Sequence, residues 1–228
     1  ETAFALMDPA LSFDAKRADG EQVGPGEAVV TISGNARAIL SAERVALNFL
    51  MRMSGIASYT ARFAAEIAHT KAKVTCTRKT VPGMRAFDKY AVRCGGGSNH
   101  RYGLDDAILI KDNHIAVAGG VEKAIRAARA YAGPLVAVEV EVDTLDQLRE
   151  ALAALPDAVL LDNMTNDQLF EAVALNRADN GGKVKLEASG NVSFDTVRAI
   201  AETGVDYIST SKITMAAPTL DVGLDIRI

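Results

Sequence analysis

From residue 74 onward, short apolar runs alternate with stretches whose apolar residues recur at helical spacing, and this alternation constrains the fold most. A strand followed by a helix, repeated several times, predicts parallel strands joined by right-handed crossovers. The apolar runs span residues 74–77, 107–110, 135–140, 158–161, 183–188 and 205–209. The intervening helices are expected at residues 117–131, 144–155, 165–176 and 193–203.

Six strands are fewer than the eight of a complete (β/α)8 barrel. We therefore expect an α/β fold with an incomplete (β/α) barrel, and an open doubly wound sheet is the alternative. Upstream, residues 1–36 contain several glycines around a short strand signal at residues 28–32. Residues 41–67 carry apolar side chains at helical intervals, interrupted only at Ser54 and Gly55, and predict one long or broken helix.

The composition limits the possible classes of protein. A chain of 228 residues, 49% of them hydrophobic, is long enough to bury a full core. No apolar stretch is long enough to span a bilayer, and no leader pattern precedes them. A pI near 5.5 argues against a general nucleic-acid binder. Two cysteines, Cys76 and Cys94, make no disulfide framework and fit a reducing cytoplasm.

Positive charge is concentrated between Arg78 and Lys111. Seven Lys or Arg residues stand there against three Asp, a local balance of +4 in a chain whose formal net charge is −4. The cations flank glycines, where a backbone can approach a ligand closely. This contrast predicts a site for anions.

Polar residues follow almost every predicted strand. In parallel barrels the carboxyl ends of the strands meet at one mouth, which is where active sites lie. We therefore expect these side chains to converge, although any single one of them is more often a solubilising loop residue. The residues in question are Arg78, Lys79, Lys111, Asp112, Glu139, Glu141, Asp162, Ser189, Ser209 and Ser211.

Glu139 and Glu141 are two residues apart on one strand, so their carboxylates point to the same side and Val138 and Val140 to the other. In a barrel the glutamates would face the interior, where buried carboxylates require cations or a metal. A structural ion-pair network at the barrel mouth is the alternative to a functional role.

Other candidates carry weaker signals. Asp162 could hold a sugar hydroxyl or a Mg²⁺ already bound to substrate phosphates, or could instead cap the next helix. The late strand ends at Ser189-Gly190 and Ser211 could cradle a phosphate, or could be ordinary turns. His100 could donate to an anion, whereas a structural role is the better interpretation of His114.

Several of these segments together resemble the quinolinate phosphoribosyltransferase family, the decarboxylating nicotinate-nucleotide pyrophosphorylases of NAD biosynthesis. The similarity runs over nearly the whole chain, and the 77–115 block is its most specific part. The other matching segments are Ala42-Glu43-Arg44, Leu47-Asn48-Phe49-Leu50, Ser54-Gly55-Ile56-Ala57, Glu139-Val140-Glu141-Val142-Asp143, Leu161-Asp162-Asn163, Glu187-Ala188-Ser189-Gly190-Asn191, Ala217-Pro218 and Leu220-Asp221.

The resemblance implies a smaller α/β sandwich domain, residues 1–54 with 217–228, followed by an incomplete barrel, residues 55–216. It implies a chain that starts inside the family's first domain. It also implies phosphoribosyl transfer from phosphoribosyl pyrophosphate to quinolinate, with Mg²⁺, giving nicotinate mononucleotide, pyrophosphate and CO2.

The resemblance also implies roles for individual residues. Quinolinate carboxylates would be held by Arg78, His100, Arg101 and Lys111. The resemblance places phosphoribosyl pyrophosphate and its metal beside Lys79, Glu141 and Asp162, with Lys79, Lys111, Glu141 and Asp162 forming the catalytic set. The 5′-phosphate region would contact Ser189, Gly190 and Ser211.

Arg44 would reach into the site of a neighbouring subunit, so the resemblance implies at least a dimer. Met215 stands where many members of the family carry a histidine. Three alternatives remain at this point: a divergent molybdenum-transport-associated homologue, a non-catalytic phosphate-binding barrel, and a lyase that uses Lys111 as a Schiff base.

Overall fold

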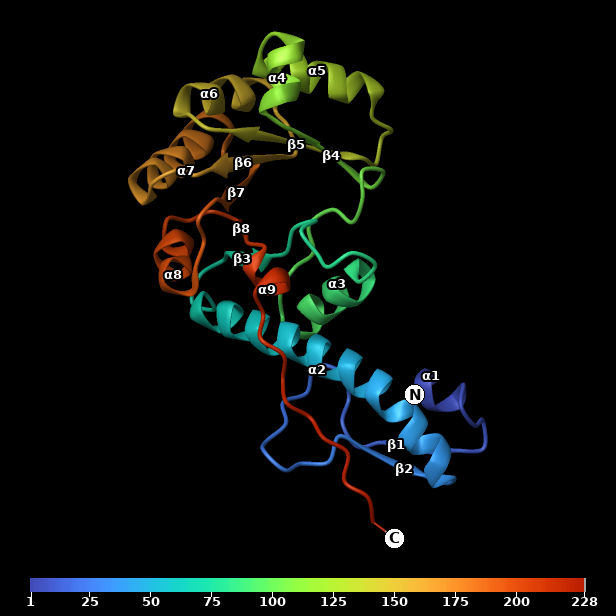
Figure 1. Ribbon diagram of the computed structural model, residues 1–228. Helices are drawn as coiled ribbons and strands as arrows, with labels where there is room; N and C mark the ends of the chain where they lie inside the picture. The colour runs from blue at the N-terminus through green and yellow to red at the C-terminus, as the bar shows by residue number, and fades with distance from the viewer. Residues whose placement is uncertain (228) are drawn as a thin grey trace.

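The computed structural model describes residues 1–227, which form a small N-terminal part, a long helix and a larger α/β part (Figure 1). The N-terminal part contains the short helix α1 (Thr2–Ala5) and the strands β1 (Ser12–Ala15) and β2 (Val30–Ser33), which pair antiparallel. Sequence patterning predicted only the second strand. The first is too short to show an alternation that stands out among its polar neighbours.

Helix α2 (Ala36–Glu66) is unbroken and 31 residues long, and it connects the two parts. Asn35 caps its first turn by accepting hydrogen bonds from the backbone N–H groups of Arg37 and Ala38. Gly55 does not interrupt it. A Cβ at this buried position would lie 2.0 Å from the carbonyl oxygen of Pro218, so the glycine allows the C-terminal segment to cross α2 closely.

Six parallel strands form a curved sheet in the order β3-β8-β7-β6-β5-β4. The first two strands of this sheet along the chain, β3 and β4, therefore lie at its opposite edges. No pairing joins these two edges among residues 1–227, and the predicted incomplete barrel is confirmed. The strands are β3 (Lys73–Thr75), β4 (Ala107–Ile110), β5 (Ala137–Val142), β6 (Ala158–Asp162), β7 (Lys185–Ser189) and β8 (Tyr207–Ser209).

Helices cover the outer face of the sheet, as the upper part of Figure 1 shows. Val138, Val140 and Leu161 are fully buried beneath them and belong to one continuous core. The helices are α3 (Arg85–Cys94), α4 (Asp112–Ala118), α5 (Val121–Tyr131), α6 (Leu145–Ala154), α7 (Asn166–Asn180), α8 (Phe194–Glu202) and α9 (Lys212–Met215). Within the described part of the chain, none of the helices is long and apolar enough to cross a membrane.

Two parts of the helix pattern differ from what the sequence predicted. The helix expected at residues 117–131 is two helices, because Gly119 and Gly120 adopt positive φ angles of 78° and 143° and end α4 before α5 begins. Helix α3 was not predicted, since it lies inside the charged block and its buried face includes Asp88 and Lys89 rather than an apolar stripe.

The open edge of the barrel is lined by the irregular segment 98–106. Its first residue, Ser98, forms a parallel bridge with Thr75 at the free edge of β3, and its N–H donates to the Val74 carbonyl at 2.8 Å. The segment then runs to β4 on the other side of the opening. It thus brings its own side chains to the mouth that the strand ends define.

Candidate active site

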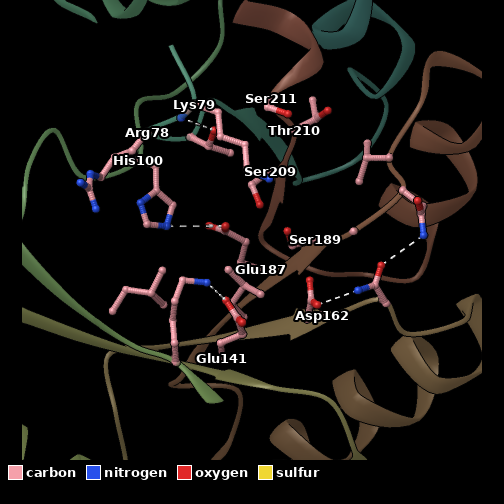
Figure 2. A pocket seen from close by; sticks show the side chains of 18 of the residues that line it. Arg78, Lys79, His100, Glu141, Asp162, Glu187, Ser189, Ser209, Thr210 and Ser211 are labelled. Atoms are coloured by element: carbon pink, nitrogen blue, oxygen red, sulfur yellow. Dashed lines mark hydrogen bonds and ion pairs between the residues drawn. The ribbon is translucent and has the colours of Figure 1, made fainter. Parts of the chain in front are cut away.

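A cavity of about 720 Å³ opens at the carboxyl ends of the strands. Figure 2 shows side chains from several strand ends pointing into it. Every residue to which the resemblance gives a role lines it except Arg44, whereas the strand-end residues Asp112 and Glu139 are not among the lining residues. The lining residues with such a role are Arg78, Lys79, His100, Arg101, Lys111, Glu141, Asp162, Ser189, Gly190 and Ser211.

Two guanidinium groups face the same part of this cavity. Arg78 follows β3, and its Nε is buried with no hydrogen-bond partner. Arg101 comes from the 98–106 segment and donates to the Ala107 carbonyl at 3.2 Å. Burial and the neighbouring charge of Arg78 lower the pKa of Arg101. Paired cations with an unsatisfied buried donor fit an anionic ligand with more than one charge.

Lys111 and Glu141 form an ion pair across neighbouring strands. Ile110 is paired in register with Val140, so the next residues along β4 and β5 lie side by side at the strand ends. Glu141 faces the cavity as predicted, while Val140 is buried on the opposite face. Lys111 is also the N-cap residue of α4, and its backbone N–H donates to Nδ1 of His114 at 2.9 Å. This capping contact is consistent with the structural interpretation of His114.

Asp162 ends β6, and it is not the cap of the next helix, since that position belongs to Thr165. Its carboxylate accepts from the Asn163 side chain at 2.6 Å. Asn163 has a φ of 53°, and a Cβ at Gly190 would lie 2.1 Å from its side-chain oxygen. The close approach of these two loops requires a glycine, and it brings Ser189-Gly190 beside Asp162.

His100 is held between an acidic cluster and its own backbone. Its Nε2 lies 2.9 Å from Glu139 and 3.6 Å from Glu187, and its Nδ1 accepts from the Arg101 N–H at 2.8 Å. Burial lowers the pKa of His100, but the two carboxylates outweigh it and raise the pKa overall. The Arg101 N–H opposes this shift, because it leaves no room for a proton on Nδ1. A contact between His100 and a bound anion would have to replace one of these partners.

Glu187 is the functional candidate that sequence reasoning passed over. It lies on β7 two residues before Ser189, and it is only 4% exposed. Burial, and then the charge of Glu139, raise its pKa to about 7. The signal was the same alternation that pointed to Glu139 and Glu141, because residues 187 and 189 share one face of a strand.

Two groups of side chains that contain carboxylates could bind a cation. Ligand atoms of His100, Glu139 and Glu187 all lie within 4.8 Å of one another; His100 and Glu187 line the wall of the cavity, but the two glutamates are almost fully buried. Glu141 and Asp162 instead face the open cavity, and carboxylate oxygens are the ligands that Mg²⁺ prefers. The residues at the mouth therefore fit a Mg²⁺ that arrives with a phosphorylated substrate.

Two sequence features lie away from the cavity. Arg44 is exposed on the part of α2 that belongs to the N-terminal end of the molecule, so it does not serve the site of its own chain. Met215 is 54% exposed on α9 and is not among the residues that line the cavity. A thioether would in any case not replace an imidazole donor at that position.

An incomplete parallel α/β barrel with five Lys or Arg residues and three carboxylates around one cavity at its strand ends defines an enzyme for small polyanionic substrates. Comparison with known families gives the particular assignment. Residues 1–54 match the family described as quinolinate phosphoribosyl transferase, N-terminal domain, and residues 56–225 match its C-terminal domain. The chain belongs to the quinolinate phosphoribosyltransferase family.

Individual relatives agree with this assignment. A probable nicotinate-nucleotide pyrophosphorylase (carboxylating) of Synechocystis sp. is 43% identical over 223 residues, which are 98% of this chain and 75% of the relative. The corresponding enzyme of Mycobacterium leprae is 44% identical over 232 residues, 99% of this chain and 81% of the relative. The solved nicotinate-nucleotide pyrophosphorylase of Francisella tularensis superposes with a TM-score of 0.92 at 43% identity, over 96% of this chain and 76% of that one.

Proposed function

We propose that this protein transfers the phosphoribosyl group of phosphoribosyl pyrophosphate to quinolinate and decarboxylates the product, giving nicotinate mononucleotide, pyrophosphate and CO2 in NAD biosynthesis. The observation that carries the proposal is the gathering of Arg78, Lys79, Arg101 and Lys111 around one cavity. These four cations, with Lys212 as a fifth on the same cavity, exceed what a single phosphate requires. They suit a pyridine dicarboxylate and a pyrophosphate bound together.

The quinolinate half of the cavity would be the side formed by Arg78, Arg101 and Lys111, with His100 in the wall beside them. Arginine offers a planar fork that matches a carboxylate in bidentate fashion, and lysine offers a movable point charge. The unsatisfied Nε of Arg78 supports this placement, because a carboxylate would supply the missing partner. Binding of His100 to quinolinate would require its Nε2 to leave Glu139.

The phosphoribosyl pyrophosphate half would be the side formed by Lys79, Glu141 and Asp162. Ser189, Gly190 and Ser211 lie at the ends of β7 and β8, where barrels commonly hold a phosphate, and would contact the 5′-phosphate. Mg²⁺ would neutralise charge on the pyrophosphate as it departs. Glu141 and Asp162 are the residues that would face the Mg²⁺ bound to the phosphates of this substrate.

The chemistry follows from charge. The ring nitrogen of quinolinate forms a bond to the anomeric carbon as the bond from that carbon to pyrophosphate breaks. Positive charge develops on the ribosyl group, and Glu141 or Asp162 can stabilise it. The ribosylated ring is then cationic and accepts the electron pair left when the neighbouring carboxylate departs as CO2, before a proton is added to that carbon. The protein contributes positioning and placement of charge.

The active assembly would be at least a dimer. Arg44 is exposed on α2 and carries a charge outside the cavity of its own chain, which supports its use in the cavity of a neighbouring subunit. The proposal places the enzyme in the cytoplasm, in line with the two free cysteines, Cys76 and Cys94.

The test is product formation from quinolinate, phosphoribosyl pyrophosphate and Mg²⁺, with nicotinate as the control acceptor. The proposal predicts nicotinate mononucleotide from quinolinate and little or none from nicotinate, which lacks the second carboxylate. Failure of the folded protein to use quinolinate would contradict the proposal. Trapping of a carbonyl substrate on Lys111 with borohydride would point to a lyase instead.

A further inference from the structure

Lys89 is a buried lysine that does not line the cavity. It lies on α3, is 1% exposed, and its Nζ donates to the His100 carbonyl at 2.9 Å and to the Cys76 sulfur at 3.1 Å. No carboxylate of residues 1–227 lies within ion-pair distance of this ammonium group. A buried charge that is held by a carbonyl and a thiol requires an explanation, because lysines are almost never fully buried.

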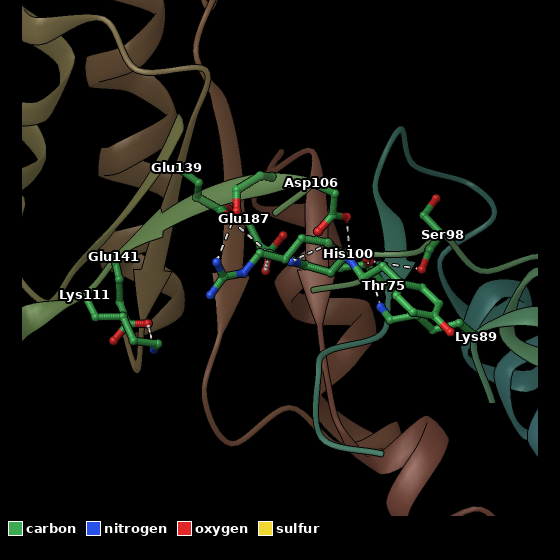
Figure 3. Close-up of polar contacts among 12 residues, drawn as sticks. Thr75, Lys89, Ser98, His100, Asp106, Lys111, Glu139, Glu141 and Glu187 are labelled. Carbon is green, nitrogen blue, oxygen red and sulfur yellow. Dashed lines mark hydrogen bonds and ion pairs between the residues drawn. The ribbon is translucent and has the colours of Figure 1, made fainter. Parts of the chain in front are cut away.

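The contacts of Lys89 all lead to the segment that closes the open edge of the barrel. Cys76, which accepts from Lys89, itself donates to the Asn99 side-chain oxygen at 3.3 Å. Lys89 thus holds residue 99 through the thiol and residue 100 directly. Figure 3 shows Lys89 reaching His100 from the α3 side, while Glu139 and Glu187 lie on the other side.

This segment has few backbone partners of its own, so side chains fix its course. The His100 ring accepts from the Arg101 N–H at 2.8 Å, and Asp106 accepts from the N–H groups of Tyr102 and Gly103 at 2.6 and 2.8 Å. Three buried residues reach the segment from the core: Thr75 donates to the Ser98 carbonyl at 3.0 Å, Cys76 donates to Asn99, and Lys89 donates to the His100 carbonyl. Of the three, Lys89 is the one that fixes the peptide group directly before Arg101, whose guanidinium faces the cavity.

We propose that Lys89 is a positioning residue, which holds the His100–Arg101 peptide so that the Arg101 guanidinium is aimed at a quinolinate carboxylate. This rests on the proposed function of the cavity. Lys89 does not touch the substrate. Its positive charge also lies on the side of His100 away from Glu139 and Glu187. It therefore offsets part of the negative charge of these two carboxylates.

The test is a double-mutant cycle on the intact enzyme. Lys89→Met keeps the length of the side chain and removes the ammonium group. We expect it to raise the KM for quinolinate about tenfold or more and the KM for phosphoribosyl pyrophosphate less than about twofold. In an Arg101→Met background the same change should have little further effect, because Lys89 acts through Arg101.

Lys123→Met is the matched control, since Lys123 is exposed on α5 and distant in the chain from the 98–106 segment. The proposal would be overturned by any of three results: an unchanged quinolinate KM in folded Lys89→Met, an equal rise in KM for both substrates, or effects that add to those of Arg101→Met. If Lys89→Met does not fold, Lys89→Gln keeps a donor for the His100 carbonyl without the charge; its quinolinate KM should then stay nearer the wild-type value than that of Arg101→Met, and a KM as high as that of Arg101→Met would overturn the proposal.

A second measurement separates this inference from the proposed function. Hydrogen exchange of the backbone amides at residues 101–103 requires no substrate. The positioning role predicts faster exchange there in Lys89→Met, with the strands β5 to β7 as protected as in the wild type. Unaltered exchange would contradict the role of Lys89 even in a protein that uses quinolinate, whereas wild-type protein without turnover would contradict only the function.

Discussion

Lys111 and Glu141 form an ion pair at the paired ends of β4 and β5, so an exposed cation of the cavity is held by a carboxylate of the same site. A bound carboxylate or phosphate can take over the ammonium group and release Glu141 for another partner. The pair therefore keeps both groups in place before the substrates arrive.

Lys111→Ala should reduce kcat/KM for quinolinate by about thirtyfold or more, since loss of one charged partner of a bound anion costs roughly 2 to 5 kcal/mol. The thermal midpoint should change little, because Lys111 is about half exposed. Steady-state kinetics and a thermal melt check both parts. Lys123→Ala is the control, and normal turnover by Lys111→Ala would remove Lys111 from the site.

Arg44→Ala should lower activity without disturbing the cavity of its own chain. If the site is shared, mixing this variant with Lys111→Ala subunits gives mixed dimers in which one site has both residues and the other has neither. Purified mixed dimers should then recover about half of the wild-type activity per dimer. No recovery in verified mixed dimers would show that Arg44 does not act across an interface.

Glu187→Gln should change how stability depends on pH. Burial and Glu139 raise the pKa of Glu187 to about 7 in the folded protein, above its ordinary value. Between about pH 5 and 7, Glu187 is therefore protonated in the folded state and ionised in the unfolded state. As the pH rises over this range, Glu187 lowers the free energy of unfolding.

Removal of the carboxyl group should make the variant progressively more stable than the wild type over that pH range, by at most about 3 kcal/mol at the upper end. Urea unfolding at several pH values measures the difference. A difference that stays constant with pH would show that Glu187 ionises normally.

Arg52 and Asp88 join α2 to α3 by two hydrogen bonds of 3.0 and 2.8 Å, and the Asp88 side chain is fully buried while that of Arg52 is 25% exposed. Arg52→Met leaves a buried carboxylate without its partner and should cost about 3 to 5 kcal/mol. Asp88→Asn leaves Arg52 within reach of water and should cost only about 1 to 2 kcal/mol. Denaturant unfolding of both variants checks the order, and the reverse order would contradict it.

The sequence allowed much of the barrel and its mouth to be predicted, because parallel strands have a strong apolar pattern and their ends meet at one place. The inward direction of Glu141 followed from the two-residue period of a strand. Helix α3 and the burial of Lys89 could not be predicted, since Lys89 is held by a carbonyl and a thiol rather than by a carboxylate that charge patterning would reveal. The unusual pKa of Glu187 likewise depends on three segments that meet only in the fold.

In the proposed reaction, one mouth couples ribosyl transfer to decarboxylation. The measurement that tests this coupling most directly is the amount of CO2 released from carboxyl-labelled quinolinate for each pyrophosphate formed, with and without phosphoribosyl pyrophosphate. Equal amounts of both products, and no CO2 without phosphoribosyl pyrophosphate, are the predicted result. Release of CO2 in its absence, or of pyrophosphate without CO2, would contradict the coupling.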